Sequence, residues 1–406
     1  MTETLKPDAA EQVAEAVAWA AAEEVPLEVL GNGSKRGLGR PVQASHSLDL
    51  SGLTGITLYE PEELVLAARA GTPMAEIEAA LAENNQQLAF EPPDLGPLFG
   101  QDAGSGTLAG VLACNLAGPR RIKAGAARDH FLGVTAASGR GELFKSGGRV
   151  VKNVTGYDLC KLVTGSYGTL AVMTDVTVKV LPAPEKTRTV LLLGLEDVAA
   201  GTAMTRALGS MHEVSGAAHL PAEAAVRSTV SYVAAGAAVT ALRVEGPGPS
   251  VEHRCAALRR ELADLGETEE LHSANSATLW REIGEVRRFL DRPDDLLWRL
   301  SVPPQSGPAV VGQIADAVPS LYYYDWGGGL IWLAVSSQDQ AGHEQIRTAL
   351  APHGGHATLV RAPEAIRAAL PVFQPLDAAK AALTGRVKDG FDPRRILNPG
   401  RMYPGL

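Results

Sequence analysis

The spacing of apolar residues changes several times along this chain and predicts a protein of mixed helices and strands. Near the N-terminus, glutamates interrupt apolar positions in the pattern of an amphipathic helix. Strands are expected at Leu27–Leu30 and 47–50, and a strand hairpin at 55–72. Apolar residues at helical spacing predict a second helix at Met74–Glu83.

Residues 91–128 are rich in glycine and proline and poor in charge. A segment of this length is costly to leave irregular in a compact domain unless it wraps something, so it is a candidate ligand-binding region. Strand-like sequence returns between 134 and 181 and ends in the β-branched run VMTDVTVKVLP. Pro182 and Pro184 follow and mark the clearest domain boundary.

Beyond that boundary, alanine-rich helical stretches alternate with the strand-like runs TVLLLGL, ALRVEG, LLWRLSV and LIWLAV. This alternation predicts an α+β domain with a largely antiparallel sheet, and it is compatible with two similar halves, although no strict repeat is present. The sequence turns glycine- and proline-rich again near its end. We therefore expect three parts: a first domain at 1–185, a second at 186–380 and a C-terminal tail at 381–406.

Composition narrows the class of protein. The 406 residues suffice for two or three domains, and the net charge of −9 argues against nucleic acid or an anionic membrane as a general partner. No run of about 18 uncharged apolar residues is present, so no membrane-spanning helix is expected. Cys114, Cys160 and Cys255 lack CxxC spacing and favour a reducing compartment over disulfides or a metal site. We expect a cytoplasmic protein that reaches the inner membrane, if at all, through a partner.

The loop GNGSKRG at 31–37 is the first candidate for chemistry. Its glycines permit positive φ and close backbone approach, so several N–H groups can converge on a phosphate. A Rossmann fingerprint is the main alternative, since Asp49 lies near the distance at which that motif carries an acidic residue. However, Pro41 argues against a helix after the loop, and the spacing is G-x-G-x-x-x-G. Alone, the loop is equally compatible with a plain turn.

Two further regions gather small and polar residues. In GSGTLAGVLACNLAGPRR at 104–121, small residues would let a flat ring or a diphosphate lie against the backbone, although a tightly packed helix would explain them too. The third region joins KNVTGYD at 152–158 to GSYGTL at 165–170. Its polar groups indicate a binding surface, although Tyr157 and Asp158 would also serve as a helix cap. Three such regions within 140 residues favour a large ligand.

Taken in order, these regions resemble the FAD-binding domain of the vanillyl-alcohol oxidase/PCMH superfamily and, within it, the GlcE-type FAD-binding subunits of bacterial glycolate oxidases. The resemblance covers most of residues 25–185 and the tail, and the second domain only diffusely. The segments that carry it are GNGSKRGLGRP (31–41), YEPEELVLAARAGTPMAEIEAALAENNQQLAFEPPD (59–94), TLAGVLACNLAGPRR (107–121), RDHFLG (128–133), KNVTGYDLCKLVTGSYGTLAVMTDVTVKVLP (152–182) and FDPRRILNPGRM (391–402).

This resemblance implies an α+β, PCMH-type fold in which two subdomains hold an extended FAD, an α+β cap domain covers the isoalloxazine, and the tail returns to the flavin domain. The pyrophosphate would be cradled by Gly31, Asn32, Gly33, Ser34, Lys35 and Gly37. The flavin would be lined by Thr107, Gly110 and Asn115, with Lys152, Tyr157 and Asp158 near its ring. The nucleotide would lie near Gly165, Gly168 and Thr169, Asn398 would lie beside the flavin, and Asp129 belongs to a matching motif without an assigned contact.

The chain departs from the superfamily's pattern in two places. Many relatives attach FAD covalently through a histidine in the first loop, where this chain offers Ser34, so noncovalent FAD is expected. Self-sufficient D-2-hydroxy-acid dehydrogenases carry a metal-binding histidine cluster in the cap. Here no adjacent pair of cap histidines is followed by an acidic ligand, and His353 and His356 are more typical of a surface turn, so no metal is expected.

The resemblance also implies an activity: oxidation of a small 2-hydroxy acid, glycolate to glyoxylate, with flavin as the electron acceptor. The partners implied are a homologous FAD subunit and an iron–sulfur subunit of the same complex. The reaction needs a base for the hydroxyl proton and a cation for the carboxylate. Arg299, Arg287 and Arg288 are candidates for the cation, no catalytic base is identified, and Trp298, Trp326 and Trp332 fit a core better than a substrate wall.

Several hypotheses remain open at this point. The subunit oxidises the acid itself within the complex, or it is a structural or electron-relay flavin subunit beside a catalytic homologue; the missing histidine cluster favours the latter. A stand-alone D-2-hydroxy-acid dehydrogenase and a Rossmann NAD dehydrogenase are the further alternatives.

Overall fold

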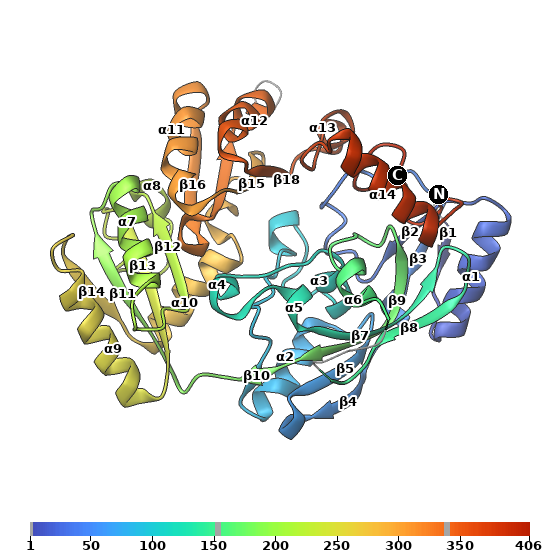
Figure 1. Ribbon diagram of the computed structural model, residues 1–406, viewed down its shortest axis with the longest axis horizontal. Coiled ribbons are helices and arrows are strands. Elements are labelled where there is room, and N and C mark those ends of the chain that lie inside the picture. The colour runs from blue at the N-terminus through green and yellow to red at the C-terminus, as the bar shows by residue number, and fades with distance from the viewer. Residues whose placement is uncertain (1–2, 151–155, 337–341) are drawn as a thin grey trace. The chain divides into compact units, whose positions relative to one another are not determined.

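The computed structural model describes residues 3–150, 156–336 and 342–406 and divides into two compact units (Figure 1). Unit 1 comprises Met1–Leu116, Gly125–Ala183 and Pro363–Leu406, and unit 2 comprises Ala117–Ala124 and Pro184–Ala362. The division at Pro184 lies beside the prolines that mark the boundary in the sequence. The chain rejoins unit 1 at Pro363, earlier than the expected tail at 381, and the short excursion of Ala117–Ala124 into unit 2 has no counterpart in the sequence analysis.

Unit 1 is built on a parallel three-stranded sheet, β1-β3-β2, and an antiparallel five-stranded sheet, β4-β5-β9-β7-β8, with a small antiparallel pair, β10-β6. Its strands are β1 (Glu3–Leu5), β2 (Leu27–Leu30), β3 (His46–Asp49), β4 (Ile56–Glu60), β5 (Val65–Arg69), β6 (Gln86–Gln87), β7 (Phe131–Ser138), β8 (Leu143–Gly147), β9 (Ala171–Lys179) and β10 (Leu181–Pro182). Its helices are α1 (Ala10–Ala22), α2 (Met74–Glu83), α3 (Leu108–Ala113), α5 (Ala127–His130), α6 (Leu159–Val163), α13 (Glu364–Ala369) and α14 (Ala378–Phe391).

The core of unit 1 follows the apolar spacing of these elements. Helix α1 buries Val13, Val17 and Ala20, which recur every three or four residues on the face that meets β7. The predicted helix Met74–Glu83 and the predicted strand Leu27–Leu30 occur with those bounds. The stretch 91–128 is less irregular than its composition indicates, because it contains the short helices α3 and α5 and, within unit 2, α4 (Arg121–Ala124).

Unit 2 contains one eight-stranded antiparallel sheet in the order β14-β11-β13-β12-β16-β17-β15-β18. Its strands are β11 (Lys186–Leu193), β12 (Gly216–Leu220), β13 (Val239–Gly246), β14 (Thr268–Leu271), β15 (Leu296–Ser301), β16 (Ser320–Asp325), β17 (Leu330–Val335) and β18 (His356–Arg361). Its helices, besides α4, are α7 (Asp197–Leu208), α8 (Ala222–Ala225), α9 (Gly248–Glu261), α10 (Ser273–Gly284), α11 (Gly307–Ala317) and α12 (His343–Leu350).

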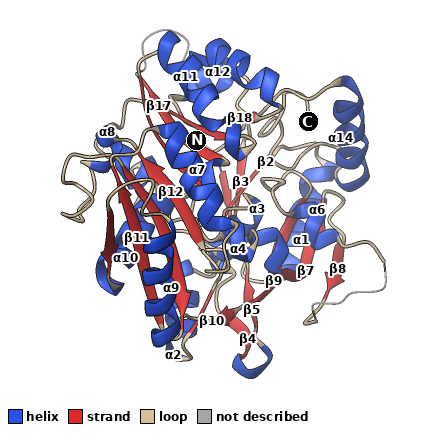
Figure 2. Ribbon diagram, turned by 60° about the vertical axis from the view of Figure 1, so that its left-hand side comes forward, coloured by secondary structure: helices blue, strands red, loops and turns tan. Residues whose placement is uncertain are grey.

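The sheet of unit 2 consists of two similar halves. Each half runs β-α-β-β-α-β along the chain, and in each half the fourth strand lies at the outside, followed by the first, third and second. Helices α7 and α9 pack on the first half, and α11 and α12 on the second (Figure 2). The halves join through β12 and β16, so the eight strands form one continuous sheet. The expected α+β domain with a largely antiparallel sheet is thus present.

Among the residues that the structure describes, no helix is long and apolar enough to cross a membrane.

Candidate functional site

A cavity opens in unit 1 between the loop that follows β2, helix α3 and the turn that precedes β9. The lining residues come from distant parts of the chain: 28–36, Leu50, Ala70, residues within 107–114 and 167–173, and the C-terminal pair Asn398 and Arg401.

The loop after β2 turns sharply at two glycines, one required by close packing and the other by its backbone conformation. A Cβ on Gly31 would lie 2.9 Å from Thr107 Oγ1, so this loop and the start of α3 approach each other closely. Gly33 has φ +74°, in the left-handed region that favours glycine. Within the described chain, the backbone N–H groups of residues 32–35 make no hydrogen bond to another protein group. Successive unpaired N–H groups on a glycine turn are a typical anion-binding arrangement.

A lysine lies directly beside these N–H groups. Lys35 Nζ is 3.2 Å from Ser34 Oγ, and a Cβ built on Gly106 would lie 3.1 Å from the same nitrogen. Burial lowers the pKa of the Lys35 ammonium, and its interactions with Cys114 and Asp94 offset this effect only in part. An anion in the cavity would compensate the cost of burying this charge.

Helix α3 forms a wall of small side chains. Thr107 caps the helix, since its Oγ1 accepts the N–H of Gly110 at 3.3 Å, and Ala109, Gly110 and Ala113 line the cavity. At the end of this wall stands Cys114, whose thiol pKa is raised by burial despite the nearby charges of Lys35 and Arg401. A wall without protruding side chains suits a flat ring or an extended diphosphate.

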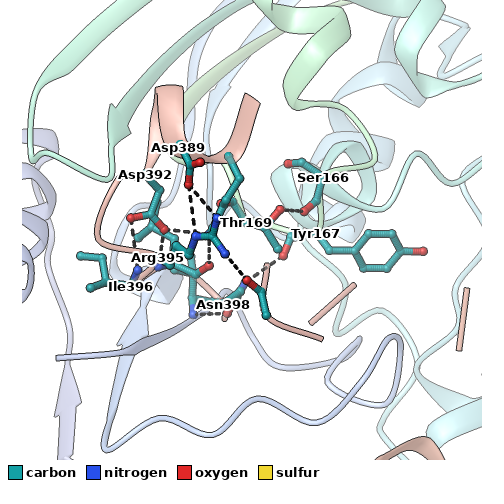
Figure 3. Close-up of polar contacts among 12 residues, drawn as sticks. Ser166, Tyr167, Thr169, Asp389, Asp392, Arg395, Ile396 and Asn398 are labelled. Carbon is teal, nitrogen blue, oxygen red and sulfur yellow. Dashed lines mark hydrogen bonds and ion pairs between the residues drawn. The ribbon is translucent and has the colours of Figure 1, made fainter. Parts of the chain in front are cut away.

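The C-terminal segment closes the cavity through Asn398. Its side-chain oxygen accepts the N–H of Val29 at 2.8 Å, and its amide nitrogen donates to the carbonyl of Tyr167 at 2.8 Å (Figure 3). Gly168, with φ +71°, leaves room for this amide, because a Cβ there would lie 2.8 Å from Asn398 Nδ2. Asn398 thereby fixes the end of β2 and the turn before β9 to each other.

A buried ion pair supports this segment from behind. Lys388 and Asp392 are almost fully buried, with Nζ and Oδ2 2.7 Å apart. Lys388 Nζ also donates to the carbonyls of Thr169 and Leu397, and the Asp392 carboxylate accepts the N–H groups of Ile396 and Leu397 (Figure 3). Because every one of these groups is satisfied, helix α14 holds the segment 396–398 and the 166–169 turn in one arrangement.

The structure brings together most of the residues that the sequence singled out. Those that line the cavity are Gly31, Asn32, Gly33, Ser34, Lys35, Thr107, Gly110, Gly168 and Asn398. Gly37 instead packs against Phe99, where a Cβ would lie 2.4 Å from Cδ1. Gly165, with φ +75°, donates its N–H to the carbonyl of Leu112, and Thr169 Oγ1 donates to the carbonyl of Ser166.

Other predicted residues lie away from the cavity lining and hold local structure. Asn115 Oδ1 accepts the N–H of Arg128 at 3.1 Å, and Asp129 Oδ2 accepts the N–H of Ala126 at 2.8 Å. Asp158 caps α6 by accepting the N–H of Lys161, while Tyr157 is 90% exposed. Lys152 lies outside the described residues.

Sequence reasoning missed the role of Arg401. Its guanidinium is buried in the lining of the cavity and donates to the carbonyl of Lys35 at 3.0 Å. Arg401 does lie in the C-terminal motif LNPGR, so the signal was present. Asp392 lies in the same segment, FDPRRILNPGRM, whereas Lys388 carries no such signal, because its burial depends on tertiary packing.

In unit 2, the arginines considered for a substrate carboxylate have different surroundings. Arg288 is buried against Glu282 at 3.3 Å, and Arg287 forms a hydrogen bond with Glu285 at 2.6 Å. Arg299 lies over the ring of Trp326. Within the described parts of the chain, no group of three or more histidine, cysteine, aspartate or glutamate side chains is placed to hold a metal ion.

Comparison with known proteins connects this cavity to a cofactor. A family model described as an FAD binding domain matches residues 3–147. The glycolate oxidase subunit GlcE of Escherichia coli (strain K12) is 34% identical over 399 residues, which cover 98% of this chain and 99% of that protein. The glycolate oxidase subunit GlcD of Bacillus subtilis (strain 168) is 36% identical over 104 residues, 26% of this chain and 21% of that protein.

Solved structures share the fold at low sequence identity. The structure of p-cresol methylhydroxylase with substrate bound covers 98% of this chain and 88% of its own, with a TM-score of 0.73 and 13% identity. This likeness confirms the predicted PCMH-type fold class. Together with the near full-length match to GlcE, it shows that the chain belongs to the GlcE family of FAD-linked oxidoreductases, within the PCMH-type flavoproteins.

Proposed function

We propose that this chain holds FAD in the cavity of unit 1 and serves as a flavin subunit of a complex that oxidises a small 2-hydroxy acid, with glycolate as the first candidate. The observation that carries the proposal is the pairing of an open nest of backbone N–H groups at 32–35 with the Lys35 ammonium, opposite a wall of small residues. The relatives named for glycolate oxidase support the substrate class.

The residues present fit FAD in shape and charge. A pyrophosphate carries negative charge on oxygens that accept several hydrogen bonds at once, and the loop at 32–35 offers both N–H donors and the Lys35 cation. Arg401 adds a second buried cation to the lining. The smooth surface of Ala109, Gly110 and Ala113 leaves room for the flat isoalloxazine. We assign to these residues the contacts with the pyrophosphate and the isoalloxazine of FAD.

The cavity lining also favours a noncovalent cofactor. Where many members of the superfamily carry a flavin-attaching histidine, this chain has Ser34, and neither histidine of unit 1, His46 or His130, lines the cavity. Cys114 is the thiol in the lining, and burial raises its pKa, which disfavours the nucleophilic thiolate. Hydrogen bonds and charge are then what retains FAD.

When bound, FAD supplies the acceptor for the hydride equivalent that leaves the α-carbon of a 2-hydroxy acid. The chain must still provide a base for the hydroxyl proton and a cation for the carboxylate. In the described lining, the carboxylate is that of Glu28, which forms a hydrogen bond with Arg36 at 2.9 Å and is thereby committed to an ion pair. The cavity therefore offers cofactor binding without a base ready for proton abstraction.

This absence among the cavity-lining groups favours a second role within the same complex, in which the chain relays electrons while a homologous subunit oxidises the acid. The match to GlcD supports a homologous partner. An iron–sulfur subunit is the further partner that we propose for this complex.

Anaerobic reduction of the bound flavin separates the two roles. The chain is purified alone, its FAD content is measured, and glycolate or D-lactate is added while the flavin absorbance is followed. We expect the absorbance to persist for minutes in the isolated chain and to bleach when the homologous flavin subunit is added. Bleaching of the isolated chain within seconds would make this subunit the catalyst.

A further inference from the structure

Unit 2 contains a strained turn whose residues do not line the cofactor cavity. Trp326 follows β16 with φ +52°, and Gly327 and Gly328 continue the turn with φ +66° and +98°. A left-handed conformation costs a residue with a side chain about 1–2 kcal/mol, so the surrounding contacts must hold Trp326 in place. Such strain is concentrated at functional sites, where a side chain must be aimed in an unusual direction.

Two hydrogen bonds fix the tryptophan. Its indole Nε1–H donates to the carbonyl of Gly118 at 3.0 Å, and its backbone N–H donates to Asp325 Oδ1 at 2.7 Å. Gly118 belongs to the segment Ala117–Ala124, which packs within unit 2 although the chain before and after it belongs to unit 1. The turn after β16 and this segment are therefore locked together.

The fixed indole ring is contacted by two arginines from distant parts of the sequence. The guanidinium carbon of Arg121 lies 4.2 Å from the ring centroid, and that of Arg299, on β15, lies 5.0 Å from it. Cation–π contacts of this kind hold a guanidinium plane flat and limit its rotation. Two like charges are thus gathered on one ring, an arrangement that an anion would stabilise.

A histidine side chain lies on the same face of the sheet as Arg299. Ser301 pairs with His356 and Arg299 with Thr358 across β15 and β18, so Arg299 and His356 lie on one face of the sheet. Burial lowers the pKa of His356, and the charges of Arg299 and Arg121 lower it further. The acidic neighbour on the turn is Asp325, which caps the N–H of Trp326.

We propose that Arg121 and Arg299, oriented by Trp326, bind the carboxylate of a small 2-hydroxy acid, with His356 at the edge of this site. The substrate class rests on the proposed function, while the anion-binding character follows from unit 2 itself. A guanidinium offers two parallel N–H groups that match the two oxygens of a carboxylate.

Calorimetric titration of the full chain with glycolate tests the proposal directly. Arg121→Gln and Arg299→Gln remove one guanidinium each, and Arg206→Gln is the control, because Arg206 pairs with exposed Asp264 elsewhere in unit 2. We expect each site variant to weaken glycolate binding at least tenfold, the double variant to abolish it, and the control to leave it unchanged. Glycolamide, which has the same size but no charge, should not bind.

The proposal is overturned if the unaltered chain does not bind glycolate, if the double variant binds it as well as the unaltered chain, or if glycolamide binds equally. Arg121 is exposed, so its replacement leaves the core intact, and circular dichroism verifies the fold of each variant. The titration is run with and without FAD. Glycolate binding by a chain that fails to take up FAD would contradict the proposed function and leave this site standing, whereas FAD uptake without glycolate binding would do the reverse.

Discussion

Gly33 determines which way the backbone N–H groups of residues 32–35, to which we assign the pyrophosphate, point. An added Cβ would meet nothing closer than Arg36 Cδ at 3.6 Å, so space is available, but φ +74° would strain any other residue. The loop would relieve this strain by turning its peptide groups, which are the groups that we assign to the pyrophosphate. The positive φ of Gly33, more than a lack of space for a side chain, is therefore the reason why glycine is needed for the proposed cofactor binding.

We expect Gly33→Ala to weaken FAD binding roughly 5- to 30-fold, because restoring the binding conformation costs about 1–2 kcal/mol. The matched control is Gly100→Ala, which has φ +70° and open space around it but does not line the cavity. It should lose similar stability and keep its FAD affinity. Quenching of FAD fluorescence during titration measures the FAD affinity of both variants. Equal affinities for the two variants would show that the loop is only a turn.

At this scale, sequence reasoning identified residue types better than their contacts. Asn398 was expected beside the flavin, and it does line the cavity, yet its hydrogen bonds to Val29 and Tyr167 span 369 and 231 residues and could not be inferred from spacing. Tyr157 belongs to an equally distinctive motif but is 90% exposed. A motif records which residue types occur together, whereas solvent exposure is decided by tertiary packing.

Among the elements, the segment Ala117–Ala124 carries an ion pair that ties it to β13. Arg120 donates to Glu245 at 2.7 and 3.0 Å, and Arg243 lies 3.6 Å from the same carboxylate. Burial alone would raise the pKa of Glu245, but the charge of Arg243 and the hydrogen bond and charge of Arg120 bring it down to about 2. The carboxylate thus stays ionised well below its ordinary value of 4.5.

This lowered pKa has a defined effect on stability. A group with a depressed pKa in the folded state stabilises the fold above its unfolded value, near 4.5, and loses that contribution as the pH falls towards 2. We expect Glu245→Gln to lower the unfolding free energy by roughly 3 kcal/mol at pH 7 and by progressively less as the pH falls from 4.5 to 2.

Urea unfolding followed by tryptophan fluorescence at several pH values measures this difference. Glu252→Gln is the control, since Glu252 pairs with Lys186 and Arg188 on the surface of the same unit and should matter little at any pH. A loss of stability in Glu245→Gln that stays constant from pH 7 to pH 2 would contradict the assignment of the charge to this ion pair.

Elements were predicted where their apolar spacing was regular, as for Met74–Glu83 and Leu27–Leu30. Where small residues dominate, a helix was only one of two alternatives. Helix α3, LAGVLA, lies in a glycine-rich stretch that resembles a loop, and it forms because Thr107 caps it and four of its six residues are buried. For unit 2, the sequence was only compatible with two similar halves and showed no strict repeat, since the halves share strand order and not residues.

For the molecule as a whole, family membership and fold class followed from an ordered set of short motifs, and the near full-length match to GlcE and the PCMH-type fold confirm both. The place where the chain rejoins unit 1 was not predicted from composition, because Pro363 to 380 contains ordinary helical sequence. The assignment of unit 2 to substrate remains a prediction, as does the central claim, that the cavity of unit 1 holds FAD without a covalent bond.

That claim is tested most directly by the flavin content of the purified chain before and after acid precipitation. We predict one FAD per chain, all of it released to the supernatant, because the proposed site would hold the cofactor with the N–H groups at 32–35 and the Lys35 ammonium, and the described lining offers no histidine for attachment. A chain purified without flavin that fails to take it up from solution, or flavin that stays with the precipitated polypeptide, would contradict it.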